Sequence, residues 1–320
     1  MMKSLRPLGS HSVLRLPARA PHPRLQKLPS PPATRPKSQL RNTSTMADTT
    51  SMQKSNRLRT AFVENKGPSY GIWQMFPGSN VSRALARANP DWIMVDCEHG
   101  NIDDAAMHEA VPAIAACGVS PLVRIPDLQS WMIKRALDCG AHGILVPLIR
   151  TVDEVKQVVA ATKFPPQGRR GFGSALAMQN FSPIPSFTEY LQQANDAILT
   201  MVQIETKEAL AAVEEIAPLV DVLFIGPFDL GNNIGYPIIN GDVKPELKEA
   251  IAKILKAAKS AGKKCGMFSS SGEEAGRYGA MGFDMINVGT DVTTLEFVMK
   301  QSMAAARGAA GPEKGKGYGS

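Results

Sequence analysis

The 320-residue chain has few cysteines, no long apolar run and no acidic residue near its N-terminus. The four cysteines form no C-x-x-C pair, so they predict neither a structural zinc site nor a disulfide framework. No stretch approaches roughly 18 consecutive apolar residues, which argues against a membrane-spanning helix. What remains is a chain with 43% apolar and 20% charged residues, which is typical of a globular protein with a sizeable core.

The basic charge of the chain is concentrated at its N-terminus. Residues 1–47 hold nine Lys or Arg, and the first acidic residue is Asp48. The whole chain has a formal charge of +7, but the remaining 27 basic and 29 acidic residues give a net charge of −2. The body is therefore close to neutral, and its charge does not indicate a nucleic-acid surface.

Residues 1–60 are rich in Pro, Ser, Arg and Thr, which predicts a disordered leader because such a segment buries little apolar area. An Arg-rich and Ser-rich N-terminus without acids also resembles an organellar presequence, although the prolines would interrupt its helix. A mitochondrial and a cytoplasmic location both remain open, and Met46 is a second plausible start. The Gly-rich residues 307–320 are expected to form a flexible tail.

Residues 61–306 alternate short apolar runs with helical patterns. The apolar runs are bounded by Gly, Pro, Asp or Asn, as expected for strands that are buried on both faces. The expected strands are 70–75, 92–96, 121–124, 143–146, 198–204, 222–225, 264–267 and 285–288. Eight strands with intervening helices predict an α/β fold of the (β/α)₈ TIM-barrel type, and this count favours it over a doubly wound sheet. The proline-rich segment 164–190 interrupts the pattern and suggests a functional loop or an oligomer contact.

Polar residues gather where the expected strands end, which is where TIM barrels place their active sites. They are Asp96, Glu98, His99, Arg124, Gln203, Glu205 and Asp229. Carboxylates from adjacent strands are the oxygen ligands that a hard divalent cation requires, although acids at strand ends also cap helices. His99 is the imidazole in reach of this end; it could act as a base or be an ordinary loop histidine. The loop 168–173 (GRRGFG) matches no phosphate-binding fingerprint.

Four runs of the sequence resemble the HpcH/HpaI aldolases, a family of metal-dependent (class II) pyruvate aldolases. They are 91–100 (DWIMVDCEHG), 165–171 (PPQGRRG), 202–206 (VQIET) and 224–230 (FIGPFDL). The resemblance covers about residues 65 to 305, with the motifs in order. It implies a TIM barrel of the phosphoenolpyruvate/pyruvate-binding type and an aldehyde-lyase that cleaves a 4-hydroxy-2-oxo acid, or a 2-keto-3-deoxy sugar acid, to pyruvate and an aldehyde.

The resemblance also implies a role for individual residues and for a cofactor. Glu205 and Asp229 match the ligands of a divalent metal (Mg²⁺, Mn²⁺ or Co²⁺), and no organic cofactor is implied. Arg124 matches the arginine that steadies the enolate oxygen, and His99 with Asp138 matches a base and its carboxylate partner. The matches to substrate-binding groups are Gln203 and the backbone amides of Gly226 and Phe228. The resemblance further implies a homo-oligomer, usually a hexamer, and makes a role in sugar-acid catabolism plausible.

The sequence departs from the family pattern in two places. Phe228 stands where smaller residues are common, and residues 230–235 (LGNNIG) replace a serine-containing run, so the aldehyde end of the site is expected to differ. Asp138 is expected to end a helix on the opposite face, which conflicts with its implied role. The main alternative is a CoA-ester lyase of the citrate-lyase β-chain or malyl-CoA-lyase type, but no basic, adenine-stacking cluster supports it. A non-catalytic barrel is the other alternative, and it would be favoured if these site residues were missing.

Overall fold

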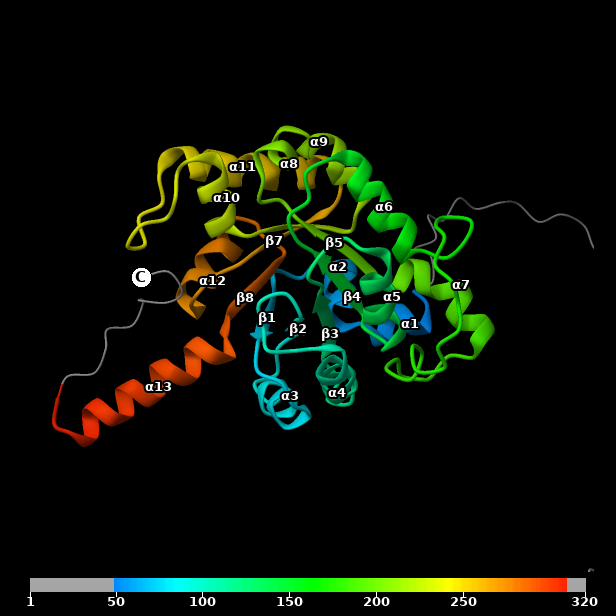
Figure 1. Ribbon diagram of the computed structural model, residues 1–320, viewed down its shortest axis with the longest axis horizontal. Helices are drawn as coiled ribbons and strands as arrows, with labels where there is room; N and C mark the ends of the chain where they lie inside the picture. The colour runs from blue at the N-terminus through cyan, green and yellow to red at the C-terminus, as the bar shows by residue number, and fades with distance from the viewer. Residues whose placement is uncertain (1–48, 310–320) are drawn as a thin grey trace, which may run out of the picture. The chain divides into compact units, whose positions relative to one another are not determined.

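The computed structural model describes residues 49–309, and they contain a closed barrel of parallel strands in sequential order (Figure 1). Each strand pairs with the next, and β1 pairs with β8. The strands are β1 (Ser69–Gln74), β2 (Trp92–Asp96), β3 (Ser120–Arg124), β4 (Gly143–Val146), β5 (Leu199–Gln203), β6 (Val222–Ile225), β7 (Lys264–Met267) and β8 (Met285–Thr290). The predicted TIM barrel is confirmed, and each expected strand is present within two residues of its predicted bounds.

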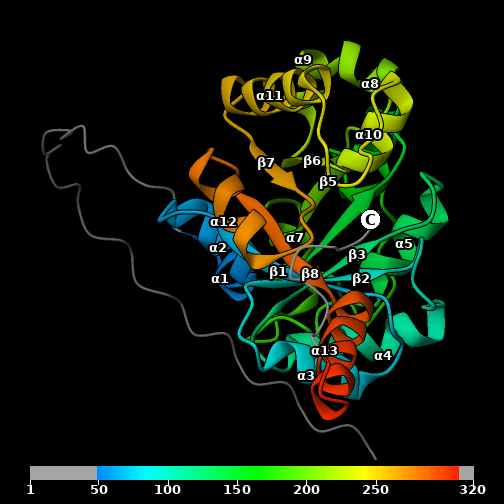
Figure 2. The ribbon, with the colours of Figure 1, turned by 90° about the vertical axis from the view of Figure 1, so that its left-hand side faces the viewer.

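Helices follow the strands and surround most of the barrel (Figures 1 and 2). They are α1 (Ser51–Ser55), α2 (Arg57–Glu64), α3 (Ser79–Ala86), α4 (Asp104–Ala115), α5 (Ser130–Asp138), α6 (Val152–Thr162), α7 (Phe187–Ala197), α8 (Lys207–Ala211), α9 (Val213–Ile216), the 3₁₀ turn η1 (Ala217–Leu219), α10 (Pro227–Ile234), α11 (Pro245–Ser260), α12 (Gly272–Ala280) and α13 (Asp291–Ala306). Among the described residues, no helix is long and apolar enough to cross a membrane.

Two apolar clusters make up the core because successive strand residues point to opposite faces of the sheet. Alternate residues such as Trp92 and Met94 fill the barrel interior, and their neighbours Ile93 and Val95 pack under the surrounding helices. Gly71 in β1 makes room for the largest interior side chain. A Cβ atom there would lie 2.1 Å from the indole ring of Trp92. The interior is therefore a packed core rather than a channel, and the site must lie at one end of it.

Helices α1 and α2 cover the end of the barrel at which the strands begin. Leu58 and Phe62 of α2 belong to the interior cluster. The buried Asn56 side chain donates hydrogen bonds to the carbonyl oxygens of His142 and Ala197, at 2.9 and 2.8 Å. The prediction of disorder up to residue 60 is wrong for this stretch. The apolar residues that hold α1 and α2 against the barrel are too few to show a helical period in the sequence. Their burial depends on the completed barrel.

The predicted presequence and most of the predicted tail lie outside the described residues, in 1–48 and 310–320. Helix α13 ends at Ala306, which agrees with the predicted end of the barrel domain. In the unusual segment 164–190, an irregular loop precedes α7, and α7 begins after a capping box made by Ser186 and Glu189. The loop and α7 pack at the end of the barrel opposite the predicted site, since α7 contacts α1.

Candidate active site

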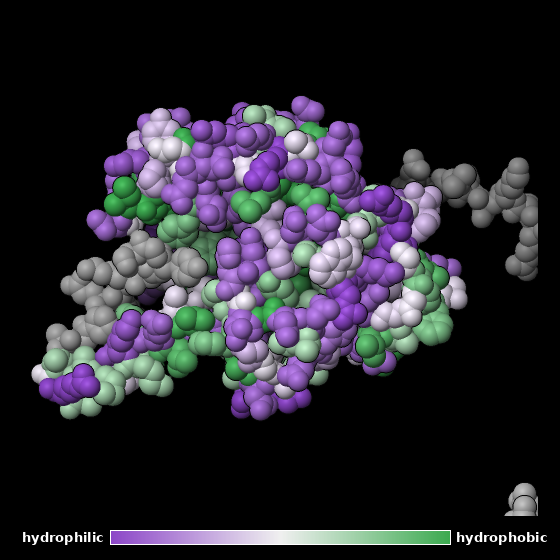
Figure 3. Space-filling view, in the orientation of Figure 1, coloured by the Kyte–Doolittle hydropathy of each residue, from purple (hydrophilic) through white to green (hydrophobic). Residues whose placement is uncertain are grey.

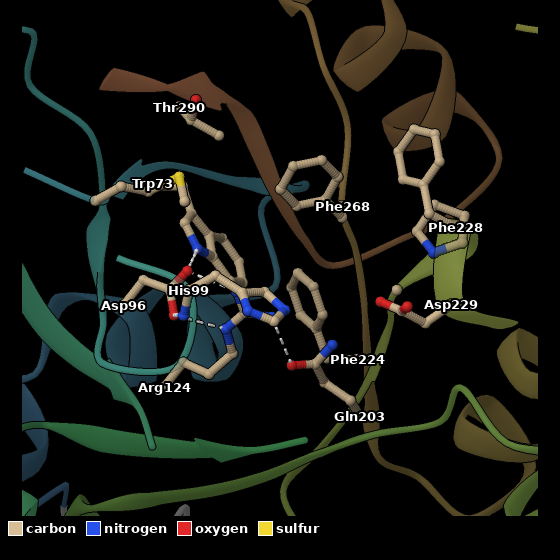
Figure 4. Close-up of a pocket in the computed structure, with 13 residues that line it drawn as sticks. Trp73, Asp96, His99, Arg124, Gln203, Phe224, Phe228, Asp229, Phe268 and Thr290 are labelled. Atoms are coloured by element: carbon tan, nitrogen blue, oxygen red, sulfur yellow. Dashed lines mark hydrogen bonds and ion pairs between the residues drawn. The ribbon is translucent and has the colours of Figure 1, made fainter. Parts of the chain in front are cut away.

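A pocket of about 180 Å³ opens at the carboxyl ends of the strands (Figure 4). Seven of the eight strands, or the residues that directly follow them, contribute to its lining. The lining residues are Trp73, Met75, Asp96, His99, Arg124, Gln203, Phe224, Gly226, Pro227, Phe228, Asp229, Phe268 and Thr290. Sequence-predicted residues from four separate segments therefore meet in one cavity.

Asp96 and Arg124 form the floor of the polar side of the pocket. Arg124 donates from Nε to Asp96 Oδ1 at 2.9 Å and from Nη2 to Asp96 Oδ2 at 2.6 Å. Trp73 Nε1 donates to the same carboxylate at 3.0 Å. Burial opposes ionisation of Asp96, but the hydrogen bond and charge of Arg124 outweigh it, so the pKa of Asp96 is lowered. The pair is thus ionised and fixes the guanidinium in one orientation.

Gln203 links this pair to Glu205. Arg124 Nη1 donates to Gln203 Oε1 at 3.3 Å, and Gln203 Nε2 donates to Glu205 Oε2 at 2.7 Å. These hydrogen bonds fix which way the amide of Gln203 points, because its oxygen faces a donor and its nitrogen an acceptor. The side chain predicted to bind substrate is therefore held rigidly between the arginine and the carboxylate predicted to bind metal.

Glu205 follows β5 and is almost fully buried, with 2% of its surface exposed. Its Oε1 accepts a hydrogen bond of 2.7 Å from the backbone N–H of Leu148, which follows β4. Burial, together with the negative charges of Asp229 and Glu98, raises the pKa of Glu205 to about 7. Because ionisation of Glu205 next to other acids is costly, a bound cation would stabilise its ionised form.

Asp229 lies in the first turn of α10, which begins directly after β6 and the short link at Gly226. It lines the pocket from the side opposite Asp96 (Figure 4). Gly226 is required here, because a Cβ atom would lie 2.5 Å from Glu205 Oε2 and 3.0 Å from Gln203 Nε2. The backbone therefore passes close to the predicted metal ligand, and Gly226 and Phe228 line the pocket as predicted.

His99 lies at the open side of the pocket, with 54% of its side chain exposed. Its backbone N–H donates to Asp96 Oδ1 at 3.2 Å, which fixes the loop after β2. Its Nε2 atom lies 3.9 Å from Glu98 Oε1, and Glu98 Oε2 lies 3.0 Å from Arg124 Nη1. Burial raises the pKa of Glu98. Glu98 therefore stands between the imidazole and the guanidinium.

The structure does not bring Asp138 to His99 within one chain. Asp138 is the last residue of α5, and β4 begins five residues later, so Asp138 lies at the end of the barrel where strands begin. Its Oδ1 atom accepts a hydrogen bond of 3.2 Å from Arg170 Nη2, in the segment 164–190. The predicted dyad of Asp138 with His99 is therefore wrong for the single chain.

Asp96 and Trp73 belong to the site but were not among the residues predicted to act. Asp96 had been noted as an acid at a strand end, but its bond to Arg124 depends on the register that pairs β2 with β3. That pairing was available from the sequence, since both residues end consecutive expected strands. Trp73 had no local signal, because an aromatic residue in a strand is ordinarily a core residue.

Glu205 and Asp229 are the residues that could hold a metal ion. Within the described part of the chain, no group of three or more His, Cys, Asp or Glu side chains is placed to hold one. Two carboxylates beside an open pocket nevertheless suit Mg²⁺, which keeps several waters and binds through one or two carboxylates. The oxygen-only donor set thus fits a hard cation and does not fit a tetrahedral zinc site.

A closed (β/α)₈ barrel with a buried arginine–carboxylate pair and further acids at its carboxyl end has the form of a TIM-barrel enzyme. The family model described as HpcH/HpaI aldolase/citrate lyase matches residues 70–296. The chain belongs to this family, as the sequence motifs predicted.

Relatives matched by sequence include aldolases of two kinds. A hydroxypyruvate/pyruvate aldolase of Agrobacterium fabrum is 32% identical over 268 residues, which cover 82% of this chain and 98% of the relative. A 4-hydroxy-2-oxo-heptane-1,7-dioate aldolase of Salmonella dublin is 36% identical over 231 residues, covering 71% and 86%.

Among solved structures, an HpcH/HpaI aldolase/citrate lyase family protein of Burkholderia cenocepacia has a TM-score of 0.72 at 33% identity, covering 79% of this chain and 99% of its own. The predicted lyase class is confirmed, and these similarities favour the aldolase over the CoA-ester lyase.

Proposed function

We propose that this protein is a divalent-metal-dependent aldolase that cleaves a 4-hydroxy-2-oxo acid to pyruvate and an aldehyde. The observation that supports this most directly is that Asp229 lines the same pocket as Arg124 and Gln203, and that Gln203 is hydrogen-bonded to the buried Glu205. A sugar-derived hydroxy-oxo acid is one substrate class that such a site would accept.

We infer that Glu205 and Asp229 hold the cation, which would be Mg²⁺, Mn²⁺ or Co²⁺. Held there, such a cation would supply Lewis acidity toward the bound 2-oxo acid. The start of α10 at Gly226 would add the dipole of a helix N-terminus, which favours the substrate carboxylate.

Arg124 acts on the negative charge that develops when the carbon–carbon bond breaks. His99 accepts the proton of the C4 hydroxyl, the C3–C4 bond breaks, and the aldehyde leaves with a new carbonyl group. The electron pair of that bond passes to C3 and the C2 oxygen, where the guanidinium stabilises it. A proton returned to C3 then gives pyruvate. Because Asp96 already fixes the guanidinium, Arg124 need not reorganise during the reaction.

We also propose that the protein forms homo-oligomers through α13. Of the sixteen residues of this helix only Asp291 is buried, and the helix runs away from the barrel (Figures 1 and 2). Exposed apolar side chains recur along it at helical spacing, and Figure 3 shows hydrophobic and hydrophilic residues on the face of this helix that is in view. They are Leu295, Val298, Met299 and Met303, each about half exposed. A helix that leaves its own barrel with an apolar stripe suits a second copy of the same chain.

The test of the catalytic proposal is pyruvate release from a panel of 4-hydroxy-2-oxo acids, before and after treatment with EDTA. We expect release to cease in EDTA and to return when Mg²⁺, Mn²⁺ or Co²⁺ is added. Glu205→Gln should abolish turnover at an unchanged fold, whereas Glu208→Gln, on the exposed surface of α8, should leave it intact. Full activity of the EDTA-treated protein would overturn the metal-dependent mechanism.

A further inference from the structure

The pocket has an aromatic side as well as a polar one. The rings of Trp73, Phe268 and Phe228 follow one another across the pocket, from Trp73 beside Asp96 to Phe228 near Asp229 (Figure 4). The ring centroid of Phe268 lies 5.5 Å from that of Trp73 and 6.5 Å from that of Phe228, and both pairs are edge-to-face. Such contacts fix the rings relative to one another and give a preformed apolar surface.

Phe228 is what extends this surface beyond the barrel interior. Trp73 is buried and packs on Phe224 at 5.6 Å, so its ring belongs to the interior core. Phe228 instead lies in the first turn of α10, next to Asp229, and is only partly buried. The aromatic row thus reaches from the core to the side of the pocket where Asp229 lies.

No Lys or Arg side chain that lines the pocket is left to pair with a second anionic group on the substrate. Arg124 is the one Lys or Arg among the lining residues, and its nitrogens face Asp96, Gln203 and Glu98. The Nε2 atom of His99 faces Glu98 in turn. The acids in or beside the pocket outnumber its cations, and they are Asp96, Glu98, Glu205 and Asp229. An anion placed against the aromatic row would lose its hydration without gaining a partner.

We propose that the aromatic row, ending in Phe228, selects uncharged acceptor aldehydes and rejects those with a terminal carboxylate or phosphate. This proposal rests on the proposed function and specifies its second substrate. The polar side of the pocket suits the 2-oxo acid, so the aldehyde chain attached to its methyl carbon contacts the remaining walls. A cavity of about 180 Å³ limits that chain to a short one.

The test is the aldol addition of pyruvate to matched acceptors, with the metal-loaded full-length protein. Butanal and 4-oxobutanoate have the same chain length and differ in the terminal carboxylate. We expect kcat/KM for butanal to exceed that for 4-oxobutanoate by about tenfold or more, as hydrophobic pockets typically discriminate. Equal values, or a preference for 4-oxobutanoate, would overturn the proposal.

A charge-introducing variant tests the role of the aromatic row. Phe228→Arg should shift the ratio of the two kcat/KM values toward 4-oxobutanoate by about tenfold, because it adds a partner for the carboxylate. Phe187→Arg, at an exposed phenylalanine of α7 outside the pocket, should leave the ratio unchanged. If Phe228→Arg does not fold, the comparison of acceptors on the wild-type protein still decides.

Exchange of the pyruvate methyl protons tests the aldolase activity separately from the acceptor selectivity, since that half-reaction needs no aldehyde. If the wild-type protein exchanges these protons but shows no preference between the two acceptors, the proposed selectivity is refuted and the proposed aldolase activity still stands. A wild-type protein that neither exchanges these protons nor joins pyruvate to an acceptor would refute the proposed function, and the selectivity with it.

Discussion

Asp96 and Arg124 are register partners at the carboxyl ends of β2 and β3, and the guanidinium donates to both oxygens of the carboxylate. The pair is almost entirely enclosed, with 0% and 10% of the two side chains exposed. Such a bidentate pair gives a fixed charge and a fixed direction. The arginine is thereby preorganised toward the pocket before any substrate arrives.

We expect Arg124→Ala to lower turnover roughly a hundred- to a thousandfold, the loss of about 3–4 kcal/mol typical when a group aimed at developing charge is removed. Pyruvate binding should weaken much less. The variant should also lose exchange of the pyruvate methyl protons, measured by NMR alongside thermal unfolding. Arg135→Ala, which breaks the exposed ion pair with Asp104, is the control and should retain exchange. Wild-type exchange in folded Arg124→Ala would remove this residue from the mechanism.

Helix α2 should contribute to the stability of the barrel, and residues before Met46 should not. A chain that starts at Met46 should keep its melting temperature and turnover, because acid-free, proline-rich segments add no core. Leu58→Ala should cost about 2–5 kcal/mol, since Leu58 is fully buried in the barrel interior. Val63→Ala, on the exposed face of the same helix, should cost under about 0.5 kcal/mol. If the two variants lost the same free energy of unfolding in urea, α2 would not close the barrel.

His142 should make the folded state less stable in acid. Burial lowers the pKa of His142 to about 4, although the carbonyl of Asn180 accepts a hydrogen bond from its ring. The unfolded chain takes up the proton near pH 6.5 and the folded chain only near pH 4, so stability falls as the pH decreases through this window.

Protonation of His142 in the unfolded chain should lower the free energy of unfolding by roughly 3 kcal/mol between pH 6.5 and pH 4. His142→Phe keeps a ring to stack on Phe181 but removes the titrating group. The free energy of unfolding of wild type minus variant should therefore decrease from pH 6.5 to pH 4. A constant difference would mean that His142 is protonated in the folded protein.

Charges on the apolar stripe of α13 should break the homo-oligomer proposed above. The double variant Leu295→Glu and Met299→Glu should reduce the particle mass measured by light scattering, because it places two carboxylates in an apolar contact. Met281→Glu, at an equally exposed methionine outside α13, is the control and should keep the wild-type mass. A monomeric wild-type protein, or an unchanged mass of the double variant, would contradict assembly through this helix.

Much of the site could be predicted because TIM barrels place the carboxyl ends of all strands at one face. Arg124, Gln203, Asp229 and His99 all line the pocket, although the first and last of them, His99 and Asp229, are 130 positions apart along the chain. Asp138 was assigned by resemblance alone, against its position at the end of a helix. Within the single chain the local pattern gives the correct position of Asp138, since a helix that leads into a strand ends at the opposite face.

The sequence by itself determined the barrel and the chemical nature of its pocket. Short apolar runs bounded by turn residues specify strands that are buried on both faces, and polar residues at their ends specify one shared polar edge. The tertiary structure alone decided which of these side chains bond to one another: the orientation of Gln203 between Arg124 and Glu205, the raised pKa of Glu205, and the row of rings ending at Phe228. Burial and partner distance exist only once strands far apart in the chain are closed into one ring.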